Sequence, residues 1–194
     1  MPATTTNNPP KQRSLLRFIA IVILTLIILV GVAVLITWLI VRPKRLVYTI
    51  EDPSIKDYKL NNNHLNATFE FFLRSYNPNT RVSVYYDSIE VSIAFNDQTV
   101  AFNTIDPFRQ PRRNVTRMEA KVVAENLALA APTARDLNHD KAVGKVELDV
   151  YVKARIRVKV GIWKSRHRTL RLVCSPVIVF SSSKNFESRE CDQI

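Results

Sequence analysis

Residues Phe18 to Val41 form an apolar stretch of 24 residues without a charged side chain. As a helix rising ~1.5 Å per residue, the stretch would be about 36 Å long, enough to cross a hydrocarbon core ~30 Å thick with some tilt. Trp38 lies near one end, where an indole prefers the headgroup level, and Arg17 and Arg42 bracket the stretch. The sequence therefore predicts a transmembrane helix over residues 18–41.

Two other structures for this stretch are disfavoured. A cleavable signal peptide usually has an apolar region of about 7–15 residues that ends in small residues, whereas this stretch is longer and is followed by Arg42-Pro43. A buried core helix would carry a polar stripe, and every face of this one is apolar. We expect an uncleaved anchor, with residues 1–17 as a disordered, basic cytosolic tail and residues 42–194 as the outer domain.

The orientation of the anchor does not follow from its flanking charges, since three basic residues lie on each side: Lys11, Arg13 and Arg17, then Arg42, Lys44 and Arg45. The sequons at Asn66 and Asn114 favour an extracellular C-terminal domain. The only cysteines, Cys174 and Cys191, predict a disulfide in such a domain, worth about 3 kcal/mol on a loop-entropy estimate. Two unrelated thiols in a cytosolic domain are the alternative.

Period-two alternation predicts β-strands in this domain. Val146–Val160 alternates strictly, and a run over Thr169–Phe180 would form a hairpin with it around a bend at Gly161–Arg168. Further strands are predicted within 46–60, 65–74, 89–95, 99–102 and 115–124, with a turn at 96–97 and a short helix over 132–139. Six to eight strands in about 150 residues fit an all-β antiparallel sandwich.

The residue types needed for catalysis are sparse. Three glycines are too few for a glycine-rich phosphate loop, and no G-x-S-x-G elbow is present. His64, His139 and His167 show no metal-ligand spacing. Asn138-His139-Asp140 fits a loop or helix end better than a catalytic pair. We expect no enzyme activity, no metal and no cofactor, although a Ser–His–Asp set could be assembled from distant residues.

The chain is basic, with 28 Lys and Arg against 17 Asp and Glu. Three basic residues precede the apolar stretch, which leaves 25 basic against 17 acidic residues and a net charge of +8 for the remainder. A candidate basic patch comprises Lys153, Arg155, Arg157, Lys159, Arg166 and Arg168. Lipid headgroups or an acidic wall polysaccharide would suit it. Nucleic acid would not meet an outer domain, and a solvated strand face is the alternative.

Five short motifs, taken together, resemble the plant harpin-induced-like family, also called the non-race-specific-disease-resistance-like family. They are Asn77-Pro78-Asn79, Tyr85-Tyr86-Asp87, Pro107-Phe108-Arg109-Gln110, Asn114-Val115-Thr116 and the run from Arg157 to Trp163. The outer domain of this family belongs to late embryogenesis abundant group 2. The resemblance covers about residues 10 to 194.

The resemblance implies a plant plasma-membrane protein whose outer domain is an immunoglobulin- or fibronectin-III-like sandwich facing the cell wall. Family members are associated with defence, including hypersensitive cell death, and some with abiotic stress. It offers no catalytic residues. We read Asn77, Pro78 and Asn79 as structural, with the proline fixing the turn and the asparagines satisfying local backbone groups.

Three hypotheses follow. The first is a membrane-anchored interaction protein in plant defence, possessing membrane or cell-wall partners. The second is a stress-protective or lipid-binding module, which an apolar cleft between the sheets would favour and a well-filled core would disfavour. The third, an extracellular hydrolase, would need a cleft with a nucleophile and a base within reach. The sequence does not predict the oligomeric state.

Overall fold

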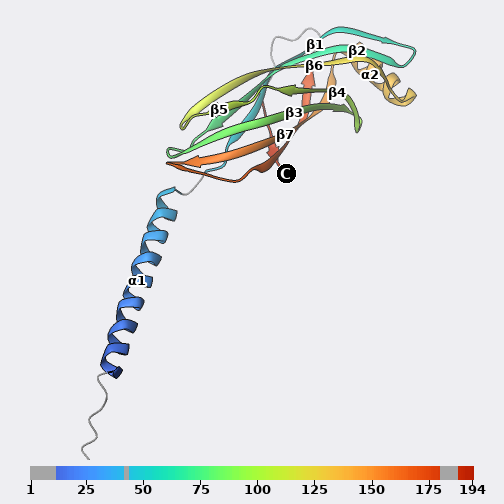
Figure 1. Ribbon diagram of the computed structural model, residues 1–194. Helices are drawn as coiled ribbons and strands as arrows, with labels where there is room; N and C mark the ends of the chain where they lie inside the picture. The colour runs from blue at the N-terminus through green and yellow to red at the C-terminus, as the bar shows by residue number, and fades with distance from the viewer. Residues whose placement is uncertain (1–11, 42–43, 180–187) are drawn as a thin grey trace, which may run out of the picture. The chain divides into compact units, whose positions relative to one another are not determined.

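The computed structural model describes residues 12–41, 44–179 and 188–194 (Figure 1). The chain divides into two compact units, Met1–Arg42 and Pro43–Ile194. Each unit is described by itself below.

The first unit contains one helix, α1 (Gln12–Val41). Its side chains over residues 15–36 are exposed, as is Trp38. Within the described residues, one helix is long and apolar enough to cross a membrane, the part of α1 from Leu15 to Ile36. An apolar helix with every face exposed requires an apolar solvent or a partner.

The start of α1 corrects one prediction. Residues 12–17, assigned above to a disordered tail, are helical. This segment contains Gln, Arg and Leu, which are good helix formers, and it continues the helix by about 1.7 turns beyond the apolar stretch. Lys11 and Arg42, two of the flanking basic residues, lie outside the described residues.

The second unit is a two-sheet antiparallel β-domain. Its seven long strands are β1 (Val47–Asn61), β2 (His64–Asn77), β3 (Val82–Phe95), β4 (Gln98–Ile105), β6 (Asn114–Ala128), β7 (Val146–Val160) and β9 (Arg168–Val179). Short strands are β5 (Phe108–Gln110), β8 (Trp163–Lys164), β10 (Arg189–Glu190) and β11 (Asp192–Gln193), and one helix, α2 (Ala131–Val143), joins β6 to β7.

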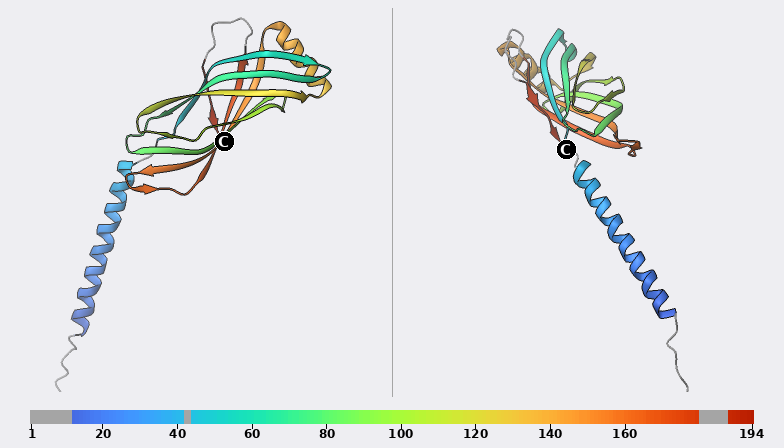
Figure 2. Two further views of the ribbon diagram at one scale, coloured as in Figure 1. Left: turned by 45° about the horizontal axis from the view of Figure 1, so that its top comes forward. Right: turned by 90° about the vertical axis from the view of Figure 1, so that its left-hand side faces the viewer.

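The strands form two layers (Figure 2). One sheet has the order β10-β1-β2-β6 and the other the order β11-β9-β7-β3-β4, with β5 paired to β3 and β8 paired to β7. Alternate residues of each strand face inward. On β7, for example, Leu148, Val150 and Val152 are buried between exposed or half-buried neighbours. The inward-facing residues of both sheets make one continuous core.

The predicted strand over residues 146–160 coincides with β7, and the predicted turn at Asn96-Asp97 joins β3 to β4 with φ of 48° and 61°. The predicted helix over 132–139 is longer, because α2 continues to Gly144, whose left-handed conformation (φ 81°) ends it. The strand predicted over 169–180 is β9, and its last residue lies outside the described residues.

The C-terminal tail connects the two sheets. β10 pairs with β1, β11 pairs with β9, and Cys191 between them forms the predicted disulfide with Cys174 of β9. The Cys191 amide donates to the Tyr48 carbonyl oxygen at 2.9 Å. The tail is therefore held covalently and by hydrogen bonds to both layers.

Candidate functional site

The family motifs gather at one end of the β-domain, where β1, β3 and β6 begin and β2 and β7 finish. Pairing places Val47 opposite Tyr76, Val82 opposite Val160 and Asn77 opposite Asn114. Four segments make up this end: residues 44–46, 78–81, 111–113 and 161–167. We call it the basic end, because these segments carry seven Lys and Arg and no Asp or Glu. The seven are Lys44, Arg45, Arg81, Arg112, Arg113, Lys164 and Arg166.

Asn79 holds the first described residue of the domain. The Lys44 amide donates to Asn79 Oδ1 at 2.7 Å, and Asn79 Nδ2 donates to the Lys44 carbonyl oxygen at 2.8 Å. Asn77 is buried and supports this contact, since its Oδ1 accepts from the Asn79 amide at 3.0 Å. The motif does bond local backbone as expected, but it also fixes a residue 35 positions away, which the sequence did not reveal.

Asn77 also joins two loops. Its Nδ2 donates to the carbonyl oxygens of Val82 and Pro111, each at 2.9 Å. The Arg113 amide donates to the Asn79 carbonyl oxygen at 3.1 Å. Together the two asparagines connect Lys44 at the start of the domain, the β2–β3 loop and the β5–β6 turn.

A buried polar network lies beneath these loops, centred on Gln110. Gln110 Oε1 accepts from Ser75 Oγ at 2.8 Å and from the Tyr86 hydroxyl at 3.2 Å, and its Nε2 donates to the Ser75 carbonyl oxygen at 2.7 Å. The Tyr48 and Tyr86 hydroxyls are 2.7 Å apart. Burial raises the pKa of both tyrosines, so the network consists of neutral groups.

The Tyr85 and Asp87 side chains lie on the outer face of the second sheet. A bulge at Asp87 interrupts the pairing of β3 with β7 and sets this carboxylate beside Arg157, which donates from Nε to Oδ2 at 2.7 Å and makes a second contact through Nη2. The Arg157 hydrogen bonds lower the pKa of Asp87. Lys164 Nζ lies 4.1 Å from the centre of the Tyr85 ring.

The six residues of the predicted basic patch do not form one free surface. Lys153 pairs with Glu90 at 3.1 Å and Arg157 pairs with Asp87. Arg155 and Lys159 lie on the same outer face and make no ion pair within the described residues. Arg166 lies in the basic end. Arg168 lines a groove between the sheets. The cations of the basic end, contributed by four separate loops, could not be recognised as one group from sequence spacing.

That groove, of about 430 Å³, opens at the basic end. Its apolar lining residues are Leu46, Val82, Val84, Ile156, Val158 and Leu170, with Tyr48 beside them. Lys44, Arg45 and Arg168 also line it. The volume falls within the ~300–1,000 Å³ typical of ligand pockets.

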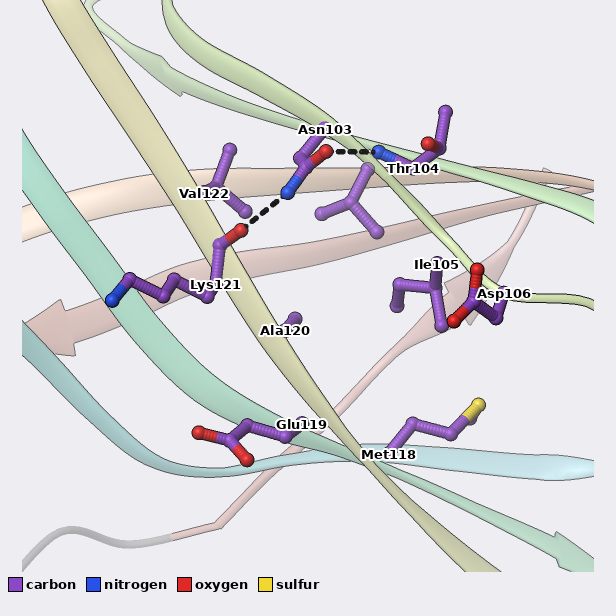
Figure 3. A pocket seen from close by; sticks show the side chains of 10 residues that line it. Asn103, Thr104, Ile105, Asp106, Met118, Glu119, Ala120, Lys121 and Val122 are labelled. Carbon is purple, nitrogen blue, oxygen red and sulfur yellow. Dashed lines mark hydrogen bonds between the residues drawn. The ribbon is translucent and has the colours of Figure 1, made fainter.

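A second hollow, of about 370 Å³, lies between the edge strands β4 and β6 (Figure 3). Asn103 spans the gap, since its Nδ2 donates to the Lys121 carbonyl oxygen at 2.6 Å. Asp106 and Glu119 contribute carboxylates to its lining, which contains no histidine or cysteine. We interpret it as the gap left where the edges of the two sheets diverge.

The sequon asparagines both use their amide oxygen as a hydrogen-bond acceptor. Asn66 Oδ1 accepts from the Asn126 amide at 2.8 Å, and Asn114 Oδ1 accepts from Thr116 Oγ1 at 3.2 Å. Neither Nδ2 donates a hydrogen bond within the described residues. Because a glycan is attached at Nδ2, neither side chain would have to break a hydrogen bond to carry one.

The histidines lie apart from one another. His64 Nδ1 is 2.9 Å from the Asn62 carbonyl oxygen, His139 is exposed on α2, and His167 Nε2 is 3.5 Å from Asp87 Oδ2. In the part of the chain that the structure describes, no three His, Cys, Asp or Glu side chains gather as a metal site would require.

The geometry defines a class of protein: an antiparallel two-sheet β-domain preceded by an apolar helix, with a basic end built by its own sequence motifs. Residues 72–174 match the family described as late embryogenesis abundant protein, LEA_2. The chain belongs to this family, and its relatives include NDR1/HIN1-like proteins, which confirms the resemblance stated above.

Three proteins from Arabidopsis thaliana illustrate the sequence similarity. Uncharacterized protein At1g08160 is 41% identical over 181 residues, covering 92% of this chain and 82% of its own length. NDR1/HIN1-like protein 3 is 32% identical over 180 residues, which cover 88% of this chain and 77% of that protein. NDR1/HIN1-like protein 10 is 30% identical over 167 residues, which cover 84% of this chain and 74% of that protein.

Two solved structures show weak similarity. A protein from Archaeoglobus fulgidus covers 62% of this chain and 94% of its own, with 14% identity and a TM-score of 0.35. The solution structure of AT1g01470 from Arabidopsis thaliana covers 73% of this chain and 85% of its own, with 12% identity and a TM-score of 0.32. Similarities of this size carry no conclusion about the fold or function of this chain.

Proposed function

We propose that this protein is a single-pass plasma-membrane protein that acts in plant defence through non-catalytic contacts of an extracellular β-domain. The observation that carries the proposal is α1, whose exposed apolar faces suit a lipid environment. The relatives named NDR1/HIN1-like support the defence role. The disulfide and the two free sequon amides support an extracellular domain.

We also propose that the domain is immunoglobulin- or fibronectin-III-like. If the long strands β1, β2, β3, β4, β6, β7 and β9 are lettered A, B, C, C′, E, F and G, the sheets have the orders A-B-E and G-F-C-C′. These orders agree with the strand neighbours of immunoglobulin sandwiches. The helix, residues 18–41, and the domain, residues 42–194, would then be anchor and interaction module.

Glycosidase treatment tests the orientation. Full-length protein from plant microsomes is expected to migrate faster on a gel after the glycan is removed, and Asn66→Gln and Asn114→Gln are each expected to remove part of this shift. The double variant should show none. A protein without any shift, whose domain is digested by protease added to intact microsomes, would refute an extracellular domain.

The defence role is tested by pathogen growth in a loss-of-function line. We expect increased growth, restored to the wild-type level by the full chain and not by a chain lacking residues 18–41. Unchanged growth, and no partner recovered by immunoprecipitation from elicited tissue, would count against the role.

A lipid-binding module is the second candidate, and the groove at the basic end favours it. Apolar walls with three cations beside them suit an acyl chain and its phosphate. Mass spectrometry of protein purified in mild detergent is expected to detect a retained phospholipid, and Val84→Trp, which fills the groove, is expected to abolish retention. Equal lipid retention in both proteins would exclude the groove as the binding site.

A further inference from the structure

The β7–β8 hairpin presents two large apolar side chains at its tip. Gly161 takes a positive φ of 57°, which allows the tight turn. Ile162 is fully exposed, and Trp163, next to it, is 61% exposed. Neither side chain packs into the core of the domain. Contiguous exposed apolar side chains on a folded domain mark a contact surface.

The tip lies at the end of the domain where the chain enters from the apolar helix. Trp163 pairs with Val160, Val160 pairs with Val82, and Asn79, three residues before Val82, holds Lys44. Only residues 42 and 43 separate Lys44 from the last residue of α1. Because a chain spans at most ~3.6 Å per residue, Lys44 lies within about 11 Å of Val41, whichever way the domain is turned.

The surroundings of the tip favour phosphate-bearing lipids. The four segments of the basic end carry seven cations and no Asp or Glu, and Lys164 and Arg166 directly follow the tip. The carboxylate beside them, that of Asp87, is paired with Arg157. On the other sheet, the paired residues Tyr76 and Val115 are 41% and 44% exposed at the same end. Indole rings prefer the headgroup level of a bilayer, and Lys and Arg bind its phosphates.

We propose that the Ile162–Trp163 tip inserts into the headgroup region of the bilayer that anchors the chain, while cations of the basic end bind the phosphates of anionic phospholipids. This inference rests on the proposed membrane anchor. It deepens that proposal, because the domain would be held against the bilayer at two places, α1 and the tip, and would present its far end to partners.

Tryptophan fluorescence of the full chain in lipid nanodiscs tests the inference, because the only tryptophans are Trp38 and Trp163. In Trp38→Phe, the remaining Trp163 is expected to emit at shorter wavelength in discs containing phosphatidylglycerol, and to lose emission when the lipids carry bromine near the glycerol. Val143→Trp, in a chain lacking both natural tryptophans, is the control. Val143 is 67% exposed at the opposite end of the domain, and its reporter is expected to show no loss.

The charge requirement is tested with paired variants. Lys164→Glu with Arg166→Glu is expected to abolish the phosphatidylglycerol-dependent loss of Trp163 emission. Lys141→Glu with Lys145→Glu, at the opposite end, is expected to leave it unchanged.

Three outcomes would overturn the inference. The first is Trp163 emission quenched no more than that of the Val143→Trp reporter. The second is a loss of emission unaffected by Lys164→Glu with Arg166→Glu. The third is a response of Trp163 to soluble polygalacturonate but not to phosphatidylglycerol, which would assign the basic end to a wall polyanion. Trp38, studied in Trp163→Phe, reports on the anchor separately: if it is not quenched by brominated acyl chains, the membrane anchor itself fails.

Discussion

The two ends of the β-domain are built from the same strands by different means. At the far end, the two-residue turns Asn62-Asn63 and Asn96-Asp97 take positive φ at both positions, which matches the twist of the strands they join. Three described loops of that end, residues 62–63, 96–97 and 129–145, carry three basic and three acidic residues. At the basic end, side chains distant in sequence bind the loops together and the charge is entirely positive.

The comparison explains why the family motifs gather at one end. A tight turn needs only residues that tolerate positive φ, so asparagine and aspartate are sufficient for the two short turns of the far end. The α2 segment at that end is joined to its neighbours by exposed bonds from Tyr58 and Asn96. The basic end has loops longer than these two-residue turns, and it receives the chain from α1. It is fixed by specific amides and hydroxyls, above all Asn77, Asn79 and Gln110. Motif residues there hold the structure around the point where the domain begins.

The largest expected effect comes from removing the disulfide. Cys174→Ala with Cys191→Ala is expected to lower the free energy of unfolding by about 3 kcal/mol, because the unfolded chain gains freedom. Since Cys191 bonds Tyr48, amide hydrogen exchange should increase at Thr49 and Ile50. Exchange at the Asn62-Asn63 turn should not change. An equal increase at both ends would show that the tail does not stabilise the basic end selectively.

Two glutamines allow a direct comparison of the ends. Gln110 is buried, and Gln98, near the far end, is half-exposed and also bonds backbone groups, of Ala128 and Ala130. Gln110→Ala removes the buried hydrogen bonds of Gln110 to Ser75 and Tyr86, although the Tyr86 hydroxyl keeps its contact with Tyr48. This change is expected to cost about 2 kcal/mol, against less than about 1 kcal/mol for Gln98→Ala. Denaturant unfolding in detergent measures both. Similar costs would contradict the role given to the buried network.

The contact between Asn79 and Lys44, the first described residue of the domain, is tested by Asn79→Ala, which removes both of its hydrogen bonds. We expect a loss of about 1 kcal/mol and faster exchange of the Lys44 amide. Asn103→Ala removes two exposed bonds, to the Lys121 carbonyl oxygen and from the Thr104 amide, and is the matched control, with an expected loss within about 0.5 kcal/mol. If the Lys44 amide exchanges at the same rate in wild type and Asn79→Ala, the hydrogen bonds between Asn79 and Lys44 are not formed in solution.

The smallest effect depends on pH. Arg157 lowers the pKa of Asp87, so the folded state binds a proton less readily than the unfolded state. The pair therefore contributes stability above the unfolded pKa of about 4, and this contribution is lost as the pH falls through the folded value. Asp87→Asn is expected to lower the melting temperature slightly at pH 7 and not at all in strong acid. A difference that persists in acid would assign the effect to packing.

Sequence patterns predicted the parts of this fold that depend on local periodicity. β7 was predictable because apolar and polar residues alternate over its whole length, and the turn at Asn96-Asp97 because those residues tolerate positive φ. β5 was not predicted, since Pro107 and Pro111 leave only three residues between them. β10 and β11 have two residues each, too few for a period.

The candidate site was predicted as residues but not as an arrangement. The motifs were recognised, yet the bonds from Asn79 to Lys44 and from Gln110 to Ser75 each join positions 35 residues apart. Such contacts depend on which strands become neighbours, and a single sequence does not encode that in any local pattern. The same reason explains why the cations of four loops were not seen as one group.

The roles proposed for both ends of the β-domain depend on the retention of α1 in the mature protein. Microsomes from tissue expressing the full chain can be extracted with alkaline carbonate, and the protein purified for intact-mass measurement after removal of glycans. The account predicts recovery in the membrane pellet and a mass that includes residues 18–41. A mature chain beginning after Val41, or one recovered in the supernatant without detergent, would contradict it.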